Sequence, residues 1–378
     1  MSERILHLTR DFPPRSGGGL STAVGELAAA QRRRGDDVAV VSFDAWRPSR
    51  SPAAPPAGSV APAHHEPGRD GMGSVQVWRI GSGDDPALVH RVASAFDPAR
   101  VEVHHPMLWS LGREVADRFA ARLAYTAHVL AAVMDELREL DTPTASAAAE
   151  AAAICEADVV HAPSRWVERE LLERWPQVAM RLRRRRLGID VGELPLVRPH
   201  GMRRFAVGMV GRFSDVKGTD AGLDVLAALL GGHPEALAVV VGGLPESARS
   251  ERRVVARFRD RTPEPVAARV TFTGWLPRAE ALEVMADTRV MLAPSVVETW
   301  GLAVTEAMAL GCCVVAAPNG GHDEQIEHLR TGILSVDHDA ASLLEDVRPL
   351  VRHPDLAEEL GMAAHRMMTS RARDEQSS

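Results

Sequence analysis

The chain has 378 residues, of which 45% are hydrophobic and 25% charged, and this composition excludes wholesale disorder and a fibrous architecture. Single hydrophobic cores stop growing well below this length, so we expect two domains. The formal net charge of -7 argues against a duplex nucleic-acid binder, because such proteins need a concentrated excess of lysine and arginine. Any phosphate site must therefore be local.

Membrane and secretion signals are weak. No apolar run approaches the roughly 20 residues of a spanning helix, and the apolar stretch near the start is too short for the core of a signal peptide. We expect a cytoplasmic protein without stable membrane insertion. Three cysteines, Cys155, Cys312 and Cys313, form no C-x-x-C pair, so neither a disulfide framework nor a zinc site is expected.

Apolar, β-branched runs alternate with helical stretches through the first half of the chain, a pattern typical of parallel sheets wrapped by helices. Residues 44–74 are dense in proline, alanine and glycine and cannot form a core, so we predict a mobile loop there. The predicted strands of this half are residues 5–9, 38–43, 75–80, 101–104, 123–127 and 159–162.

A charge run with proline and glycine, residues 183–201, separates this series from a second one and is predicted to hold the interdomain linker. The second series of strands is residues 205–210, 237–241, 270–273, 290–293, 313–316 and 333–336, followed by one or two helices within 356–372. We therefore predict an α/β fold with two Rossmann-like, doubly wound domains facing a central cleft. The expected divisions are 1–195, 196–350 and a helical end, 351–378, that packs back on the first domain.

The most informative segment is residues 293–324, APSVVETWGLAVTEAMALGCCVVAAPNGGHDE. It predicts a strand, a loop carrying Glu298, a glycine at 301, and a helix with Glu306 in its early turns. Such a layout puts unpaired backbone N–H groups at the carboxyl edge of a parallel sheet, where these folds bind phosphates. Two carboxylates would repel a diphosphate, so we interpret them as ligands of the sugar and ribose hydroxyls of a nucleotide sugar.

Cations for the diphosphate come from GRFSDVKG, residues 211–218, directly after the first strand of the same half. Taken alone, Arg212 and Lys217 would most often be surface charges, but the acid pair favours a binding role. Lys217 is also the only lysine of the chain. A lysine kept where arginine is used everywhere else indicates a compact ammonium that a planar guanidinium cannot replace.

At this point the sequence resembles the family 4 glycosyltransferases of the GT-B fold. Their signature reads roughly P-S-x-x-E-x-x-G-L/I-x-x-x-E-A-M-A-x-G followed by G-G-x-x-E, and this chain has PSVVETWGLAVTEAMALG and then GGHDE. The family's G-R-x-x-x-x-K-G box, its glycine-rich loop after the first strand (PPRSGGG), a T-x-H at 126–128 and a G-x-L at 274–276 are also present. The resemblance covers nearly the whole chain.

The resemblance implies roles position by position. Arg212 and Lys217 match the diphosphate cations, Glu306 the ribose ligand, and Glu298 the residue that orients the donor sugar. The further implied contacts are backbone amides around Gly301, Leu302 and Ala303, the glycines Gly17 and Gly18 of the first domain, the backbone at Leu276 for the base, and His128 beside the donor sugar near the acceptor.

The resemblance also implies the reaction. Family members retain the anomeric configuration by front-face attack, in which the leaving diphosphate takes the acceptor proton and cations stabilise its charge. Glu298, His128, Arg212 and Lys217 are then the catalytic set, with no metal and no cofactor. The expected donor is a hexose-type nucleoside-diphosphate sugar, UDP rather than GDP, and the expected acceptor is a small molecule such as an aminocyclitol antibiotic precursor or another secondary metabolite.

Several alternatives stay open. A sugar-nucleotide epimerase or a phosphorylase could use the same fold, a cell-envelope lipid could be the acceptor, and a non-catalytic binding subunit would keep the same motifs. The run 181–186 is usually solvated surface but could attract an anionic acceptor or lipid. Asp339 is better interpreted as a helix N-cap than as part of a metal-binding D-x-D, and the pair His104-His105 lacks partners at ligand spacing.

The chain departs from the family at two places. Relatives often have Asn-Gly-[VI]-Asp after the last strand of the first domain, whereas this chain has RRLGID, residues 185–190. Trp300 also stands where the usual residue is phenylalanine. Both departures concern the acceptor more than the donor.

Overall fold

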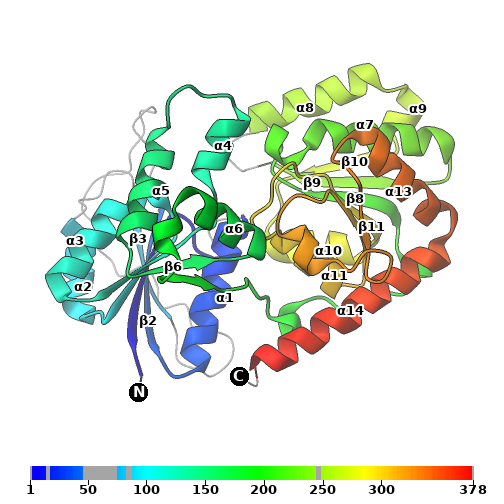
Figure 1. The fold of residues 1–378 in the computed structure, drawn as a ribbon. Coiled ribbons are helices and arrows are strands. Elements are labelled where there is room, and N and C mark those ends of the chain that lie inside the picture. The colour runs from blue at the N-terminus through cyan, green and yellow to red at the C-terminus, as the bar shows by residue number, and fades with distance from the viewer. Residues whose placement is uncertain (1, 14–17, 46–74, 82–86, 244–247, 377–378) are drawn as a thin grey trace. The chain divides into compact units, whose positions relative to one another are not determined.

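The computed structural model describes residues 2–13, 18–45, 75–81, 87–243 and 248–376. Contacts divide the chain into two compact units, Met1–Gly188 and Ile189–Ser378 (Figure 1). This division lies within the segment predicted to hold the linker. The predicted boundaries after 195 and 350 stay predictions.

Unit 1 is built on a parallel sheet of seven strands in the order β3-β2-β1-β4-β5-β6-β7. The order changes direction between β1 and β4, which is the switch point of doubly wound folds, where the crevice at the carboxyl ends of the strands binds ligands. The strands are β1 (Arg4–Thr9), β2 (Asp37–Ala45), β3 (Gln76–Gly81), β4 (Arg100–Val103), β5 (Arg122–Thr126), β6 (Val159–Ala162) and β7 (Leu182–Arg184).

Helices lie in the described connections between these strands, as is usual for parallel pairing. They are α1 (Gly19–Arg33), α2 (Ala87–Phe96), α3 (Trp109–Phe119), α4 (Ala131–Leu137), α5 (Ala145–Glu156) and α6 (Arg165–Arg174), with short 3-10 turns at η1 (Pro106–Leu108) and η2 (Pro176–Val178). Thr144 and Ser164 cap α5 and α6 by accepting backbone N–H bonds from Ala147 and Val167.

Strand β7 was missed from the sequence because its arginines were interpreted as solvated charge. It pairs with β6 at the edge of the sheet, where charged side chains are tolerated. Arginines of this run bond groups within unit 1, namely Arg181 to the Ala157 carbonyl, Arg183 to the Met180 carbonyl, Arg184 to Glu168 and Arg185 to Glu102.

Unit 2 repeats the plan with six parallel strands in the order β10-β9-β8-β11-β12-β13. The switch point falls here between β8 and β11. The strands are β8 (Phe205–Gly211), β9 (Ala238–Gly242), β10 (Val270–Gly274), β11 (Thr288–Ala293), β12 (Cys313–Ala316) and β13 (Ile333–Leu334).

Both faces of this second sheet are buried, which is why its strands are nearly continuous apolar runs. Val290 and Leu292 of β11 pack into one core cluster with α7 and α13, while Met291 between them packs into the other with α10 and α11. The helices are α7 (Thr219–Gly232), α8 (Ala248–Arg261), α9 (Glu264–Ala267), α10 (Arg278–Ala286), α11 (Leu302–Ala309), α12 (His322–Gln325), α13 (Ala340–Arg352) and α14 (Pro354–Gln376), with 3-10 turns η3 (Val191–Glu193), η4 (His200–Met202) and η5 (Asp215–Lys217).

The end of the chain is one long helix, α14, which packs against α11, α13, β11 and β12 of the same unit. Its predicted packing on the first domain stays a prediction. Asp339 caps α13 by accepting the N–H groups of Ala341 and Ser342, so the N-cap interpretation is confirmed.

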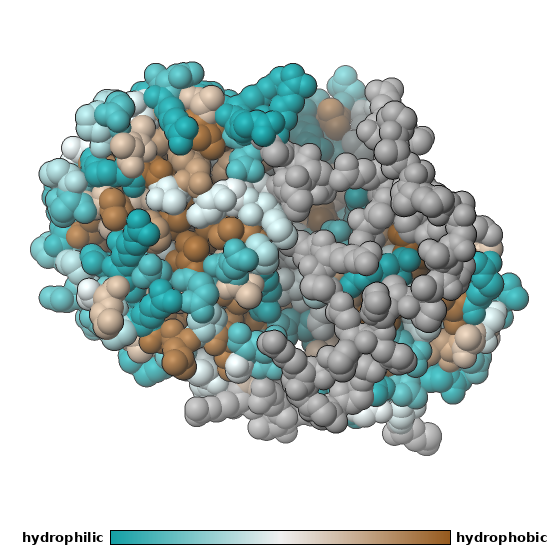
Figure 2. Space-filling view, turned by 180° about the vertical axis from the view of Figure 1, so that it is seen from behind, coloured by the Kyte–Doolittle hydropathy of each residue, from teal (hydrophilic) through white to brown (hydrophobic). Residues whose placement is uncertain are grey.

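Two Rossmann-like α/β units with parallel sheets confirm the predicted fold class. Most of the predicted loop 44–74 lies outside the described residues, and its first two residues end β2. Among the helices that the structure describes, none is long and apolar enough to cross a membrane. The face in Figure 2 carries hydrophilic and hydrophobic residues intermixed, as globular surfaces usually do.

Candidate active site

The candidate site of unit 2 lies at the switch point, where the loops after β8 and β11 meet. The two strands are neighbours in the sheet, so their carboxyl ends lie side by side. The backbone N–H of Val296 in the second loop donates to the Val216 carbonyl in the first, at 2.8 Å. The predicted cation box and the predicted acid loop are thus held together by the backbone.

Glycine is required where the two loops touch. Gly218, directly after η5, has φ +61, and a Cβ added to it would overlap the carbonyl oxygen of Pro294 at the end of β11. Ser214 begins the same turn and accepts the Lys217 N–H through its side chain. The glycine of the K-G pair therefore lets the lysine approach the end of β11.

Lys217 and Glu298 form an ion pair across the two loops. Burial alone would raise the pKa of Glu298, but the Lys217 ammonium, which also donates a hydrogen bond to this carboxylate, and the Arg212 guanidinium outweigh burial and hold the pKa below its ordinary value. Glu298 is therefore a carboxylate. Arg212 is exposed on the surface yet close enough to contribute to this field.

The helix after the acid loop begins as predicted. Gly301 has φ +93 and precedes α11, whose first backbone bond runs from the Val304 N–H to the Gly301 carbonyl. The amides of Leu302 and Ala303 come before that bond, as the first N–H groups of any helix do. Together with the positive end of the helix dipole, they form a seat for an anion.

His322 is a residue of this site to which the sequence assigned no role, although it lies in the GGHDE segment. It is buried, its Nδ1 donates to the Ala317 carbonyl at 3.1 Å, and its ring packs under Gly301 and beside Glu298. Burial and then Lys217 lower the pKa of His322, against the opposing effect of Glu298. The ring is neutral and packs against the loop that carries Glu298 and Gly301.

Glu306 has a partner that the sequence did not predict. Its Oε1 accepts a 2.8 Å bond from Arg278 Nε at the start of α10, and both side chains are mostly buried. Burial raises the pKa of Glu306, and Arg278 offsets this only in part. No spacing rule links residues 28 positions apart on two helices, so only the structure could find Arg278.

The remaining predicted residues lie on other elements. Leu276 lies between β10 and α10, and its side chain packs into an apolar cluster with residues of β8, β9 and α10. Gly18 caps α1 in unit 1, and an added Cβ there would meet nothing within 4 Å. Gly17 lies outside the described residues. His128 follows β5 and bonds His104 at 3.0 Å.

In chemical terms, unit 2 offers two cations, Arg212 and Lys217, and an anion seat at the start of α11. The carboxylates of Glu298 and Glu306 can accept hydrogen bonds from hydroxyl groups. Residues 18–188 match the family described as Glycosyl transferase 4-like domain, and residues 197–367 match Glycosyl transferases group 1. The chain belongs to the family 4 glycosyltransferases of the GT-B fold. One match falls in each unit, so the family relation covers most of both units.

Individual known proteins are also similar to this glycosyltransferase. A D-inositol 3-phosphate glycosyltransferase of Acidothermus cellulolyticus is 30% identical over 310 residues, which are 74% of this chain and 66% of that protein, just under two thirds of its length. Two solved structures share the fold. Sucrose-phosphate synthase from Thermosynechococcus elongatus has a TM-score of 0.76 at 20% identity, covering 97% of this chain and 94% of that one. Anabaena HepE in complex with UDP-glucose has a TM-score of 0.72 at 19% identity, and the match covers 100% of this chain and 98% of that one.

Proposed function

We propose that this glycosyltransferase moves a hexose-type sugar, with retention, from a nucleoside-diphosphate sugar to a small cyclitol-like acceptor. The observation that carries the proposal is the group Arg212, Lys217 and Glu298 beside the first amides of α11. A diphosphate matches the cations and the helix start, and a sugar hydroxyl matches the carboxylate between them. The donor nucleoside is proposed to be uridine, as in the UDP-glucose bound by HepE.

Lys217 can contact Glu298 and the diphosphate at the same time. Its ammonium carries three donors, so it can keep Glu298 and still bond a phosphate oxygen. As the bond to the sugar breaks, negative charge grows on the diphosphate, and preorganised cations stabilise that charge more strongly than they stabilise the ground state. The leaving diphosphate then accepts the proton of the acceptor hydroxyl, so no separate protein base and no metal is needed in this scheme.

Glu306 and Arg278 are proposed to receive the ribose. The carboxylate accepts hydroxyl hydrogen bonds, and Arg278 holds it in place. The backbone at Leu276 is proposed to hold the base.

The acceptor is proposed to be a cyclitol or aminocyclitol, a class that includes precursors of secondary metabolites. The relative of Acidothermus cellulolyticus is named for an inositol phosphate, which is a cyclitol.

A two-step experiment tests the proposal. First, UDP, GDP and ADP are compared for the rise in melting temperature that each produces, because a ligand of the native state raises stability with occupancy. Second, the donor sugar of the best nucleotide is incubated with inositols and aminocyclitols, and products are identified by mass and by the anomeric coupling constant. Binding of no nucleoside diphosphate would refute the proposal, an inverted anomer would refute retention, and an isomerised free donor would indicate an epimerase.

A further inference from the structure

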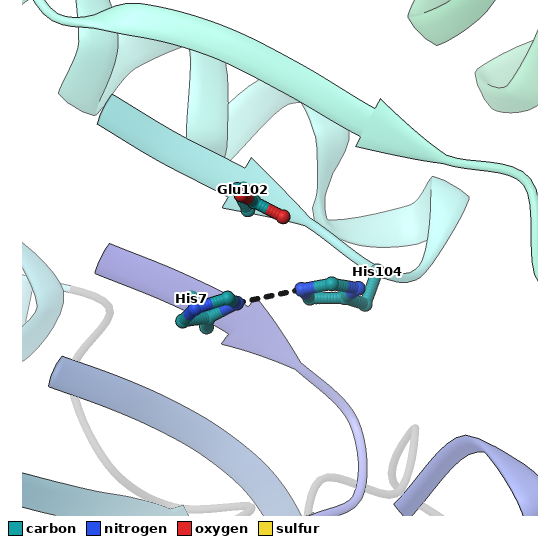
Figure 3. Close-up of side chains that lie close together, drawn as sticks. All are labelled: His7, Glu102 and His104. Atoms are coloured by element: carbon teal, nitrogen blue, oxygen red, sulfur yellow. Dashed lines mark hydrogen bonds between the residues drawn. The ribbon is translucent and has the colours of Figure 1, made fainter. Parts of the chain in front are cut away.

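Three histidines form a chain of hydrogen bonds at the switch point of unit 1. His7 lies in β1, His104 directly follows β4, and His128 follows β5. These strands are neighbours in the sheet, and the register pairs His7 with Glu102, two residues before His104 and on the same face. His7 Nδ1 lies 2.8 Å from His104 Nε2, and His104 Nδ1 lies 3.0 Å from His128 Nε2. Figure 3 shows the hydrogen bond between His7 and His104.

The inner end of this chain is an amide and a carboxylate. Gln31 of α1 places its Oε1 2.7 Å from His7 Nε2 and donates from its Nε2 to Glu102 Oε1 at 3.0 Å. His7, Gln31, Glu102 and His104 are all at most 1% exposed, whereas His128 is only partly buried. The chain therefore runs from the interior of unit 1 to its surface.

Glu102 fixes the direction of the chain because it is ionised. Arg185 binds both of its oxygens, at 3.3 and 2.7 Å, and Arg100 lies 3.3 Å from one of them. Burial alone would raise the pKa of Glu102, but Arg185 above all holds it well below its ordinary value. A carboxylate only accepts hydrogen bonds, so the amide nitrogen of Gln31 faces Glu102 and its oxygen faces His7.

The rings themselves are neutral. Burial lowers the pKa of His7 and, with the neighbouring histidines, lowers that of His104 well below the ordinary value. Burial and the charge of Arg185 lower the pKa of His128 to about 3. A neutral imidazole has one donor and one acceptor, so each ring that donates on one side must accept on the other.

We propose that Gln31, His7 and His104 are positioning residues that lock His128 into the tautomer with a protonated Nε2 and an unprotonated Nδ1. His7 must donate from Nε2 to the Gln31 oxygen, so its Nδ1 accepts from His104 Nε2, and His104 Nδ1 accepts from His128 Nε2. In every hydrogen bond of this chain, the donor lies on the side of His128 and the acceptor on the side of Glu102. His128 is left with Nδ1 as a hydrogen-bond acceptor and cannot donate from it.

The same residues also have the spacing of a metal site, since ligand atoms of His7, Glu102 and His104 lie within 4.8 Å of one another. Charge argues against a cation. Arg185 and Arg100 already neutralise Glu102, and two guanidiniums beside the carboxylate would repel a divalent ion. The hydrogen-bonded chain uses the same atoms without moving an arginine.

For the reaction, the locked tautomer means that Nδ1 of His128 can accept but not donate a hydrogen bond, so His128 does not protonate a leaving group from that atom. This consequence rests on the proposed function, whereas the tautomer itself does not. Ordered hydrogen-bond partners behind a functional ring fix its tautomer, as they do for histidines that bind metals.

The test reads the tautomer directly. In the full chain with 15N-labelled histidine, two-bond and three-bond proton correlations distinguish protonated from unprotonated ring nitrogens, and His128→Gln assigns the signals of residue 128. At pH 7.5 the wild type is expected to show His128 as the Nε2–H form alone. Gln31→Met removes the acceptor at the far end of the chain, so His128 is expected to become a mixture of both tautomers.

Two further variants separate positioning from folding. Gln31→Glu should keep the wild-type signal, because a carboxyl next to Glu102 can still accept from His7. His161→Gln changes a histidine that is also near Glu102 and Arg185 but outside the chain, and it should leave His128 unchanged. Circular dichroism of each variant verifies the fold.

A protonated Nδ1 on His128 in the wild type, or an unchanged tautomer in Gln31→Met, would overturn the proposal. Stoichiometric Co²⁺ that shifts the signals of His7 and His104 would show a metal site and overturn it as well. In a transferase assay, Gln31→Met should lower kcat/KM and leave the affinity for UDP unchanged. A wild type that transfers no sugar would refute the proposed function alone, because the tautomer is measured without substrate.

Discussion

Lys217 is the residue whose replacement is most informative at the donor site. Lys217→Ala removes a charge-assisted contact to the diphosphate of roughly 1.5 to 3 kcal/mol, so UDP should bind about 10- to 100-fold more weakly. Calorimetric titration with UDP measures this. The same change leaves Glu298 without its ion-pair partner, which adds to the loss.

Two controls sharpen the result. Lys217→Arg keeps the charge but not the compact ammonium, so it should recover only part of the affinity. Arg330→Ala removes a cation that is 79% exposed and paired with Glu327, and it should leave UDP binding unchanged. Equal affinity in Lys217→Ala and wild type would contradict a diphosphate role for this lysine.

The two glutamates should differ in kinetics. Glu298 lies with Lys217 and Arg212, so Glu298→Ala should lower kcat more than Glu306→Ala does. Glu306 is bonded to Arg278 rather than to these cations, so the loss of its carboxylate should mainly raise the KM for the donor. Initial rates at varied donor concentration separate the two effects. The reverse order would mean that the roles are exchanged.

Residue spacing predicted the part of the site that lies within one segment. Glu298, Gly301 and Glu306 are close in sequence, and the strand, loop and helix that carry them follow from local pattern. His7 and His104 are 97 positions apart and meet only because the sheet order places β1 beside β4. The sequence therefore showed His104 without any partner, and Arg278 was missed for the same reason.

At the scale of elements, the start of α11 depends on one glycine. Gly301 has φ +93, where a side chain costs roughly 1–2 kcal/mol, and a Cβ there would lie 2.9 Å from His322 Nε2 and 3.1 Å from Glu298 Cγ. Gly301→Ala should therefore lower the free energy of unfolding by at least about 1 kcal/mol and weaken UDP binding. Urea unfolding and calorimetry measure the two effects.

Gly232→Ala is the matched control. Gly232 ends α7 without a positive φ, and an added Cβ would meet nothing within 4 Å. Alanine there reduces the freedom of the unfolded chain and should be neutral or stabilising. If both variants lost stability equally, the strain at Gly301 would not be the cause.

Element prediction succeeded where burial on both sheet faces imposes an apolar run. Every strand predicted in the second half overlaps an observed one, because Val290, Met291 and Leu292 and their counterparts must be apolar whichever face they meet. Strand β7 failed this rule. It is an edge strand of arginine and leucine, and its pairing with β6 leaves no periodic trace in the sequence.

At the scale of the whole molecule, the strand order of unit 2 repeats that of the first six strands of unit 1, and each switch point carries different chemistry. In unit 2 the loops after β8 and β11 bring together Lys217 and Glu298, which are charged and partly exposed. In unit 1 the equivalent strands β1 and β4 bring together His7 and His104, which are neutral and buried. Topology brings the residues together, and burial decides which of them stay charged.

Partly buried histidines should make stability depend on acid. Burial lowers the pKa of His128 and His161 to about 3 and that of His105 to about 4, from 6.5 in the unfolded chain. Between these limits the unfolded state binds more protons than the native state, so stability rises with pH. The contribution is complete above pH 6.5 and is lost as the pH falls toward about 3.

Glu150 acts in the opposite direction and provides the test. Burial raises the pKa of Glu150 to about 7 from 4.5. Its contribution to the stability of the native state is therefore fully present below pH 4.5 and is lost as the pH rises through about 7. In urea unfolding at pH 5.0 and 7.5, the wild type should be less stable at the lower pH. Glu150→Gln removes the opposing effect and should widen that difference, whereas His161→Gln should narrow it. A difference that is the same in all three proteins would show that these buried groups do not control the acid response.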